Sequence, residues 1–302
     1  MDILTAVYQI LMMLGIALIG LWLRRRDVFS PPVIKGVNAI VLQVAMPALV
    51  LMISQKDYTP EVMDSFWRIL LASTVLLAAG GVGLFLLSKR FVQPDRRAAF
   101  AAMVMLPNAA FMGIPIVTAL YGDLGVAYLS GFIVAFNVAG WTAFHALFAD
   151  RHANPLKPLM NAGFISTLGA LVLIYFKIRL PVPFVSLFTQ LGNLTTPLGM
   201  LLAGARLYEL KPALLRDRSL WVGSGLSLLA VPLVMWLILK ALGFTGMALN
   251  IVTLGFMMPS AVTVQLFAEK YDKDSVYAAT GVSLTTLLCV VTIPLMMWVT
   301  GL

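Results

Sequence analysis

Two short polar interruptions, each built on proline, lie inside long apolar stretches of this sequence. The first runs from Pro107 to Pro115 and includes Asn108 and Gly113, and the second lies at 259–260. Proline removes a backbone donor and clashes with the preceding helical turn, while glycine adds backbone freedom. Both stretches therefore predict broken helices, although a single break of this kind is also typical of a simple proline kink.

A broken helix could bind an anion without any charged side chain. The break frees backbone amides and carbonyls, and the second half-helix starts with its own positive dipole end. Two antiparallel broken helices that meet in mid-membrane would direct these ends at one point. The candidate substrate-binding residues are Pro107, Asn108, Gly113, Pro115, Asn137, Pro259, Ser260, Val262 and Thr263. Asn137 fits a helix–helix contact equally well, because a buried amide needs hydrogen-bond partners.

The sequence offers little for catalysis or metal binding. A single cysteine, Cys289, excludes an internal disulfide or a multi-cysteine metal site. The two histidines form no cluster, and no GxGD, HExxH or GxSG string occurs. We therefore expect no cofactor, no bound metal and no enzymatic activity. His145 is interpreted as a packing group, and Glu269 as a solvated or paired residue at the end of a span.

Composition sets the class of protein that must position these residues. Of 302 residues, 61% are hydrophobic and only 11% are charged, against roughly 45–50% and 25% in soluble domains. The mean hydropathy is +0.95. A globule of this length needs a polar surface, so a soluble enzyme, a nucleic-acid-binding module and a disordered chain are excluded. An all-helical integral membrane protein remains.

Ten apolar stretches are long enough to be membrane spans, since roughly 20 apolar residues cross a bilayer as helix. They run approximately over 4–23, 33–53, 66–88, 98–120, 125–148, 159–176, 184–205, 220–241, 246–268 and 275–300. The joint at 122–123 is so short that the fourth and fifth spans are predicted to form a tight hairpin.

Lysine and arginine fix the predicted orientation. Sixteen of these 21 residues fall in or beside the odd-numbered loops, and five in the even-numbered ones. The positive-inside rule then places the odd loops in the cytoplasm and both termini on the outer side of the inner membrane. The net charge of +8 is thus a topology signal and does not indicate nucleic-acid binding.

The two halves of the chain resemble each other. The string 106–110 resembles 258–262 at an offset of 152, and Pro47 and Tyr121 match Pro197 and Tyr271 at an offset of 150. An odd number of spans in each half makes the second half inverted, as in many secondary transporters. We predict a first five-helix repeat over 1–155 and an inverted second repeat over 156–302.

These motifs also carry a family resemblance over essentially the whole chain. The relevant strings are Leu106-Pro107-Asn108, Met112-Gly113-Ile114-Pro115, Tyr121-Gly122, Gly36-Val37-Asn38, Ala45-Met46-Pro47, Pro259-Ser260 and Ala268-Glu269-Lys270-Tyr271. The chain resembles the auxin efflux carrier family, which includes the plant auxin carriers and bacterial permeases for malonate or malate.

The resemblance implies ten helices in two inverted five-helix repeats, an elevator fold like that of the bile-acid carriers, and a homodimer. Spans 1, 2, 6 and 7 would form the scaffold, and spans 3–5 and 8–10 the moving transport domain. A substrate carboxylate would lie at the crossover beside Asn108, near Pro115 and Pro259, with Asn137 matching a polar site residue of the plant carriers. The third span, around 72–74, lacks the charged pair of the plant carriers, and the central loop is reduced to about 150–158.

The predicted function is a secondary carrier of a small organic anion, with membrane lipid and a second copy as its other partners. The alternative is a sodium- or proton-coupled organic-anion symporter of the bile-acid-carrier type, for which acidic residues near the crossing are expected. An intramembrane protease lacks its motifs here, and a receptor or structural protein would leave the paired breaks without a use.

Overall fold

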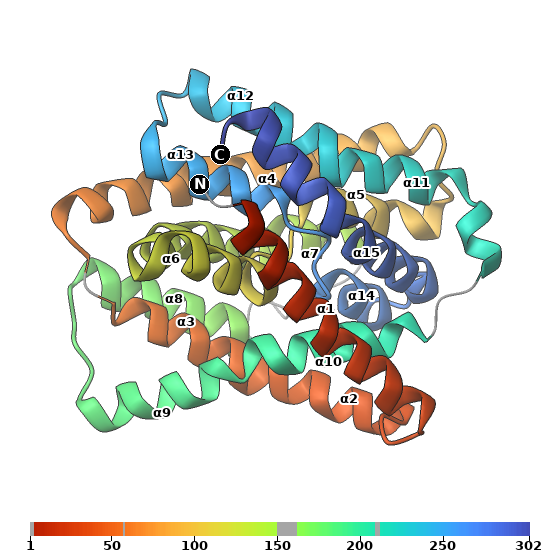
Figure 1. Ribbon diagram of the computed structural model, residues 1–302, viewed down its shortest axis with the longest axis horizontal. Helices are drawn as coiled ribbons and strands as arrows, with labels where there is room; N and C mark the ends of the chain where they lie inside the picture. Colours follow the sequence, from red (N-terminus) through yellow and green to blue (C-terminus); the bar gives the residue numbers. More distant parts are fainter. Residues whose placement is uncertain (1–2, 57, 150–161, 209–211) are drawn as a thin grey trace.

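A computed structural model of the chain describes residues 3–56, 58–149, 162–208 and 212–302. Across these ranges the backbone is helical and forms no β-strand (Figure 1). The α-helices of the first half are α1 (Ile3–Arg25), α2 (Pro31–Ile40), α3 (Met46–Ser54), α4 (Pro60–Ser88), α5 (Arg97–Met105), α6 (Ile114–Ala139) and α7 (His145–Phe148). Those of the second half are α8 (Ala162–Tyr175), α9 (Val182–Asn193), α10 (Thr195–Leu207), α11 (Arg218–Gly225), α12 (Val231–Ala241), α13 (Gly246–Met257), α14 (Thr263–Lys270) and α15 (Ser275–Thr300).

Short π-helical and 3-10 segments join several of these helices. The π-helical ones are η1 (Val41–Ala45), η3 (Ala109–Gly113), η4 (Gly140–Phe144) and η7 (Leu226–Ala230), and the 3-10 ones are η2 (Pro94–Arg96) and η6 (Pro212–Arg216). Three of the π segments end two residues before Pro47, Pro115 and Pro232. A wider turn accommodates the missing proline N–H while the helix continues.

Six helical stretches in the described ranges are long and apolar enough to cross a membrane. They are Leu4–Arg25, Pro31–Ser54, Pro60–Ser88, Ala109–Phe148, Arg218–Ala241 and Ser275–Thr300. The prediction of an all-helical, multi-pass membrane protein is therefore confirmed. The other predicted spans form shorter or interrupted helices, so ten spans in two inverted repeats stay a prediction. The predicted boundary at 155/156 and the short loop at 150–158 lie outside the described residues.

The stretch Ala109–Phe148 is not one straight helix. Gly122 has φ 64° and ψ −159°, which is a non-helical conformation that glycine adopts without a steric penalty. The chain therefore changes direction at the joint that the sequence placed between the fourth and fifth predicted spans.

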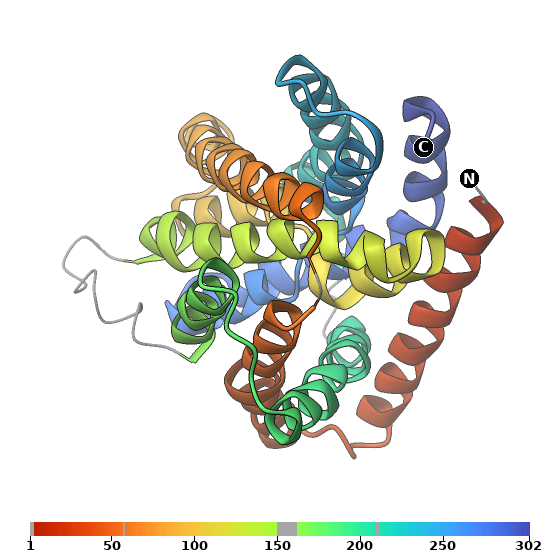
Figure 2. The ribbon, with the colours of Figure 1, turned by 90° about the vertical axis from the view of Figure 1, so that its left-hand side faces the viewer.

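The helices fall into two groups that pack against each other, among other places where α1 meets α6 and where α10 meets α15 (Figure 2). In the α1 group, which comprises α1–α3 and α8–α10, α1 packs along α10 and α3 packs on α8 and α9. In the α4 group, which comprises α4–α7 and α11–α15, α4 packs on α5 and α6, α13 packs on α12 and α6, and α14 packs on α15.

Two ion pairs connect these groups at opposite ends of the molecule. Lys56, after α3, lies 2.9 Å from Asp123 beside the Gly122 joint. Arg206, near the end of α10, lies 3.0 Å from Glu269 in α14.

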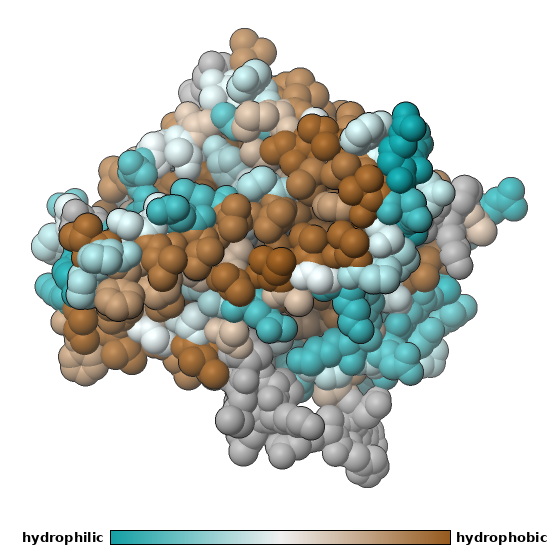
Figure 3. All heavy atoms as spheres, turned by 90° about the horizontal axis from the view of Figure 1, so that it is seen from below, coloured by the Kyte–Doolittle hydropathy of each residue, from teal (hydrophilic) through white to brown (hydrophobic). Residues whose placement is uncertain are grey.

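The loops are sorted between two ends of the structure. Figure 1 places the segments 26–30, 89–96 and 212–217 at one end, and 55–56, 58–59 and 176–181 at the other. Seen from below, an apolar band crosses the molecule, and many hydrophilic residues gather at its right-hand end (Figure 3). The separation of the loops between the two ends agrees with the predicted division into odd-numbered and even-numbered loops.

Arg96 joins three chain segments at the end that carries the odd loops. Its guanidinium Nε lies 2.7 Å from an oxygen of Asp274, and its Nη1 lies 2.9 Å from an oxygen of Asp217. Both carboxylates also cap helices, because Asp217 accepts from the amide of Ser219 in α11 and Asp274 from the amide of Tyr277 in α15. One cation therefore stabilises two helix N-termini that each carry a carboxylate.

Gly204 in α10 allows the close contact between α10 and α1. A Cβ atom at this position would overlap the carbonyl group of Ala17. We expect Gly204→Ala to lower the free energy of unfolding by about 1–3 kcal/mol, because neither backbone can move aside without disturbing the packing. Thermal melting in detergent would measure the effect.

Gly15→Ala in α1 is the matched control, because a Cβ atom there has no neighbour within 4 Å. It should melt at or slightly above the wild-type temperature, since alanine favours helix over glycine. An unchanged melting temperature for Gly204→Ala would contradict the packing argument.

Candidate functional site

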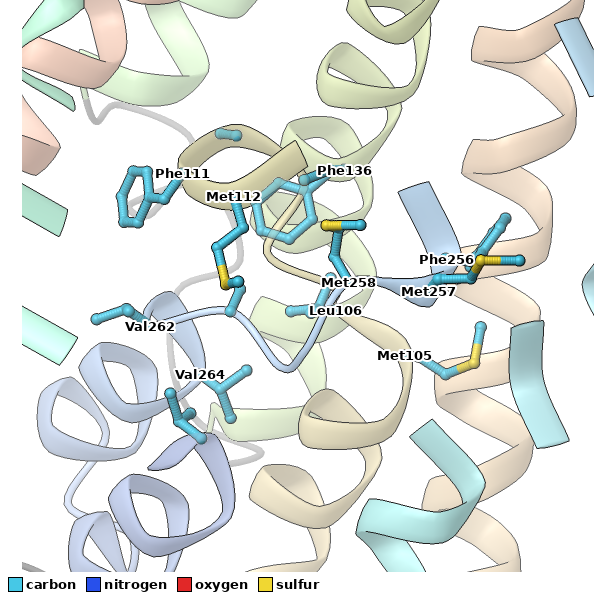
Figure 4. Packing of buried hydrophobic residues seen from close by; sticks show 14 of the residues in the cluster. Met105, Leu106, Phe111, Met112, Phe136, Phe256, Met257, Met258, Val262 and Val264 are labelled. Carbon is cyan, nitrogen blue, oxygen red and sulfur yellow. The ribbon is translucent and has the colours of Figure 1, made fainter. Parts of the chain in front are cut away.

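The two helix interruptions lie directly against each other. One separates α5 from η3 and the other separates α13 from α14. The amide of Asn108 donates to the carbonyl of Pro259 over 2.7 Å, and the amide of Ala261 donates to the carbonyl of Leu106 over 2.8 Å. These bonds form an isolated antiparallel bridge between Pro107 and Ser260. Figure 4 shows the two non-helical links crossing, with Leu106 beside Met258.

The bridge satisfies only part of the backbone that the breaks set free. Ala109 donates to the carbonyl of Pro107, and the amides of Met112 and Gly113 share the carbonyl of Asn108. The intervening amides, those of Ala110 and Phe111, have no backbone or side-chain acceptor among the described residues.

The start of α14 has the same feature. Val264 and Gln265 donate to Ala261 and Val262, but the amides of Val262 and Thr263 have no acceptor in the described ranges. Free amides at a helix start carry the positive end of the helix dipole. Each break therefore supplies backbone donors next to the crossing.

Two buried hydroxyls accompany these amides. The side chain of Ser260 is fully buried and that of Thr263 is 8% exposed, and neither Oγ has a hydrogen-bond partner among the described residues. The amide of Ser260 donates to the hydroxyl of Thr285 in α15 over 3.2 Å. A buried hydroxyl without a partner costs free energy, so these two groups are available to a ligand.

A cavity reaches the crossing from one side. Its narrow part, about 20 Å³, has Asn137 and Thr263 as its polar side chains and holds roughly one water molecule. The remaining lining residues are apolar: Leu42, Met46, Leu106, Phe136, Gly140, Trp141, Gly163 and Phe267. Asn137 is 3% exposed and donates from Nδ2 to the carbonyl of Ile133 over 3.0 Å. Its amide retains a further donor hydrogen.

A wider chamber adjoins the narrow part. It measures about 250 Å³ and shares four lining residues with the narrow part, namely Leu42, Trp141, Thr263 and Phe267. The chamber adds Gln43, Ala162, Leu266 and Lys270. Among these described lining residues, Lys270 alone carries a charge.

The structure places the predicted site residues at several positions around the crossing. Asn137 and Thr263 line the cavity. The backbone bridge holds Pro107, Asn108, Pro259 and Ser260. Gly113 lies near Met258, since a Cβ atom on it would be 3.7 Å from Met258 Cγ, and Val262 is the buried residue before α14.

Pro115 departs from the expectation of a broken backbone. It lies at the start of α6, and the chain stays helical from 109 through this proline. The π segment η3 provides the wider turn that compensates for the missing donor. The break in this stretch is therefore confined to 106–108.

Glu269 is paired, as the sequence predicted, whereas the interpretation of His145 as a packing group stays a prediction. His145 is buried, and its ring meets that of Tyr271 edge to face at 5.0 Å between centroids. Glu269 pairs with Arg206 and accepts from the side-chain amide of Gln265 over 3.0 Å. In the described ranges, no group of three His, Cys, Asp or Glu residues is placed to hold a metal ion.

Sequence reasoning did not select several lining residues, although helical spacing offered a signal. Trp141 follows Asn137 by four residues, and Phe267 and Lys270 follow Thr263 by four and seven residues. Residues at these spacings share one face of a helix. Asn137 thus indicates Trp141 as a lining residue, and Thr263 indicates Phe267 and Lys270.

Known proteins similar to this chain are transporters. The family described as "Membrane transport protein" matches residues 3–162 and 154–297. An uncharacterized transporter of Methanocaldococcus jannaschii is 21% identical over 302 residues, covering 96% of this chain and 97% of the relative. The uncharacterized transporter YfdV of Escherichia coli is 24% identical over 317 residues, covering 97% of each chain.

The family match covers nearly the whole chain and agrees with its long apolar helices. The chain therefore belongs to the membrane transport protein family that includes the auxin efflux carriers.

Proposed function

We propose that this transporter is a secondary carrier that moves a small organic anion across the inner membrane, with its termini on the outer side. The anion is held at the crossing of the two interrupted helices. The observation that carries the proposal is the backbone bridge, which brings two sets of free helix-start amides together beside an apolar cavity.

The donors at the crossing suit a carboxylate. An anion there accepts from the free amides at 110–111 and 262–263 and from the nearby hydroxyls of Ser260 and Thr263. Asn137 contributes a side-chain amide from the cavity wall. A dipole end contributes about 0.3–1 kcal/mol when exposed and up to about 2 when partly buried.

Several such donors give micromolar to millimolar affinity, or roughly −8 to −4 kcal/mol. Weak binding suits a carrier that must release its cargo. The chamber of about 250 Å³ is smaller than the pockets of roughly 300–1,000 Å³ that hold drug-sized ligands, which favours a small acid.

The two helix groups support an elevator mechanism. The bridge and most of the donors belong to the α4 group, whereas α1 and α10 pack in the other group. A movement of the α4 group along the α1 group carries the anion across, with the α1 group forming the contact in a homodimer.

The function is tested first by ligand binding to purified protein. A panel of small carboxylic acids, each paired with its neutral amide, is screened by thermal melting. A ligand that binds only the folded state raises the melting temperature by mass action. We expect one or more acids to raise it and their amides to leave it unchanged.

Uptake of the stabilising acid into proteoliposomes then tests transport, with protein-free liposomes as the control. Absence of uptake for every acid in the panel would contradict the function. Imposed sodium and proton gradients test coupling. A strict requirement for either gradient would favour the coupled symporter instead.

A further inference from the structure

Lys270 is an exposed residue that lines the chamber beside the helix crossing. It is the last residue of α14, whereas Thr263, which lines both the narrow and the wide part, is the first. Seven residues of α-helix span about 10 Å. The side chains of these two residues therefore mark the two ends of one wall.

The ammonium group of Lys270 rests on aromatic rings. Its Nζ lies 5.5 Å from the ring centroid of Trp141 and 5.4 Å from that of Tyr271. Such contacts are attractive because the face of an aromatic ring is electron-rich. Trp141 lines both parts of the cavity, so the rings hold the charge at the chamber wall.

No carboxylate of the described chain lies within ion-pair distance of Lys270. The adjacent Glu269 is engaged by Arg206 and Gln265. Within the described ranges Lys270 thus has no ion-pair partner, and the other lining residues of the chamber are uncharged.

The free amides at the helix crossing and the charge of Lys270 attract an anion over different distances. The electrostatic attraction of a helix end falls off within its first turn. The free amides therefore do not attract an anion that lies beside Lys270. A full charge next to low-dielectric walls attracts over a longer range and raises the local concentration of the opposite charge.

We propose that Lys270 is the anion-capturing residue of this carrier: held on Trp141 and Tyr271, it draws the substrate into the chamber and toward Thr263. This inference rests on the proposed function. In this arrangement Lys270 selects anionic over neutral substrates, and the neutral donors at the crossing then hold the anion.

The test measures concentration-dependent uptake of the stabilising acid by Lys270→Gln and Lys270→Arg proteoliposomes. We expect Lys270→Gln to raise KM by about tenfold, within the range of electrostatic steering effects, and to leave the maximal rate within about a factor of two. Lys270→Arg keeps the charge and should restore the wild-type KM. The KM difference between wild type and Lys270→Gln should shrink at high salt, which screens an exposed charge.

Lys89→Gln is the matched control. Lys89 also rests on an aromatic ring, with Nζ 5.8 Å from the centroid of Phe85, but it follows α4 and lines neither part of the cavity. Its KM should stay at the wild-type value.

An unchanged KM in Lys270→Gln, or an equal rise in both glutamine variants, would overturn the role of Lys270 while wild-type uptake keeps the proposed function intact. A loss of maximal rate in Lys270→Arg as well would indicate a structural role and also overturn it. Absence of uptake by the wild type would overturn the proposed function and this inference together.

Discussion

Replacing Asn108 with alanine should slow uptake of the transported acid by a factor of about 10–100 and leave the melting temperature nearly unchanged. A hydrogen bond to a charged group contributes about 1.5–3 kcal/mol, and each 1.36 kcal/mol is tenfold in rate. Asn108 is buried and directly precedes η3, whose amides at residues 110 and 111 are free. Its side chain makes no capping hydrogen bond to that segment. The side-chain amide of Asn108 is therefore available to the anion.

The fold should tolerate this change because the bridge uses only the main chain of residue 108. The backbone amide of Asn108 donates to the carbonyl of Pro259, and its backbone carbonyl accepts from the amides of Met112 and Gly113. Alanine preserves all these bonds. Uptake into proteoliposomes and melting in detergent measure the two effects separately.

Asn38→Ala is the control for the loss of a buried asparagine. Asn38 is 6% exposed and lies in α2, outside the two interrupted segments 106–108 and 258–262. Its uptake should stay close to wild type. Wild-type uptake by Asn108→Ala would refute the assignment of this residue to the site.

Tethering the two helix groups to each other should reduce uptake to the level of protein-free liposomes. The tether joins cysteines introduced at positions 56 and 123. In the wild type, Nζ of Lys56 in the α1 group lies 2.9 Å from a carboxylate oxygen of Asp123 in the α4 group. A short bis-methanethiosulfonate linker would fix this distance and thereby block an elevator movement. Because Cys289 is the one native cysteine, a Cys289→Ala background leaves only the introduced pair.

The double variant without the linker should still transport, because an exposed ion pair contributes at most about 1 kcal/mol. Dithiothreitol should restore uptake by releasing the linker. A tether inside the α1 group, between cysteines at 55 and 178, is the control. These two positions already contact each other through Gln55 Nε2 and the carbonyl of Ile178, 3.4 Å apart. Full uptake with the 56–123 tether closed would exclude an elevator movement of these groups.

The connecting ion pairs also bear on the predicted repeat. Lys56 and Arg206 are 150 residues apart, the same offset that separates Pro47 from Pro197. Lys56 follows α3 and Arg206 lies near the end of α10, both in the α1 group, and both pair with carboxylates of the α4 group at opposite ends of the molecule. Such an arrangement is the one that an inverted repeat would generate.

Several features of the fold follow from local chemistry and could be predicted from the sequence. The high apolar content required a helical membrane protein, because backbone groups in lipid must bond within their own segment. Pro107 and Pro259 marked the helix breaks for a related reason, since neither residue has an N–H to donate. The turn at Gly122 was also readable, because glycine permits the positive φ that the joint adopts.

Only the tertiary structure decided what depends on residues distant in sequence. Pro115 stayed helical because the π segment before it widened the turn, and no local rule distinguishes it from Pro107. The bridge to the 259–261 segment, and the contact between Lys270 and the ring of Trp141, join segments more than 100 residues apart. Periodicity shows which residues share one helix face, but the packing of the helices decides which faces meet around a cavity.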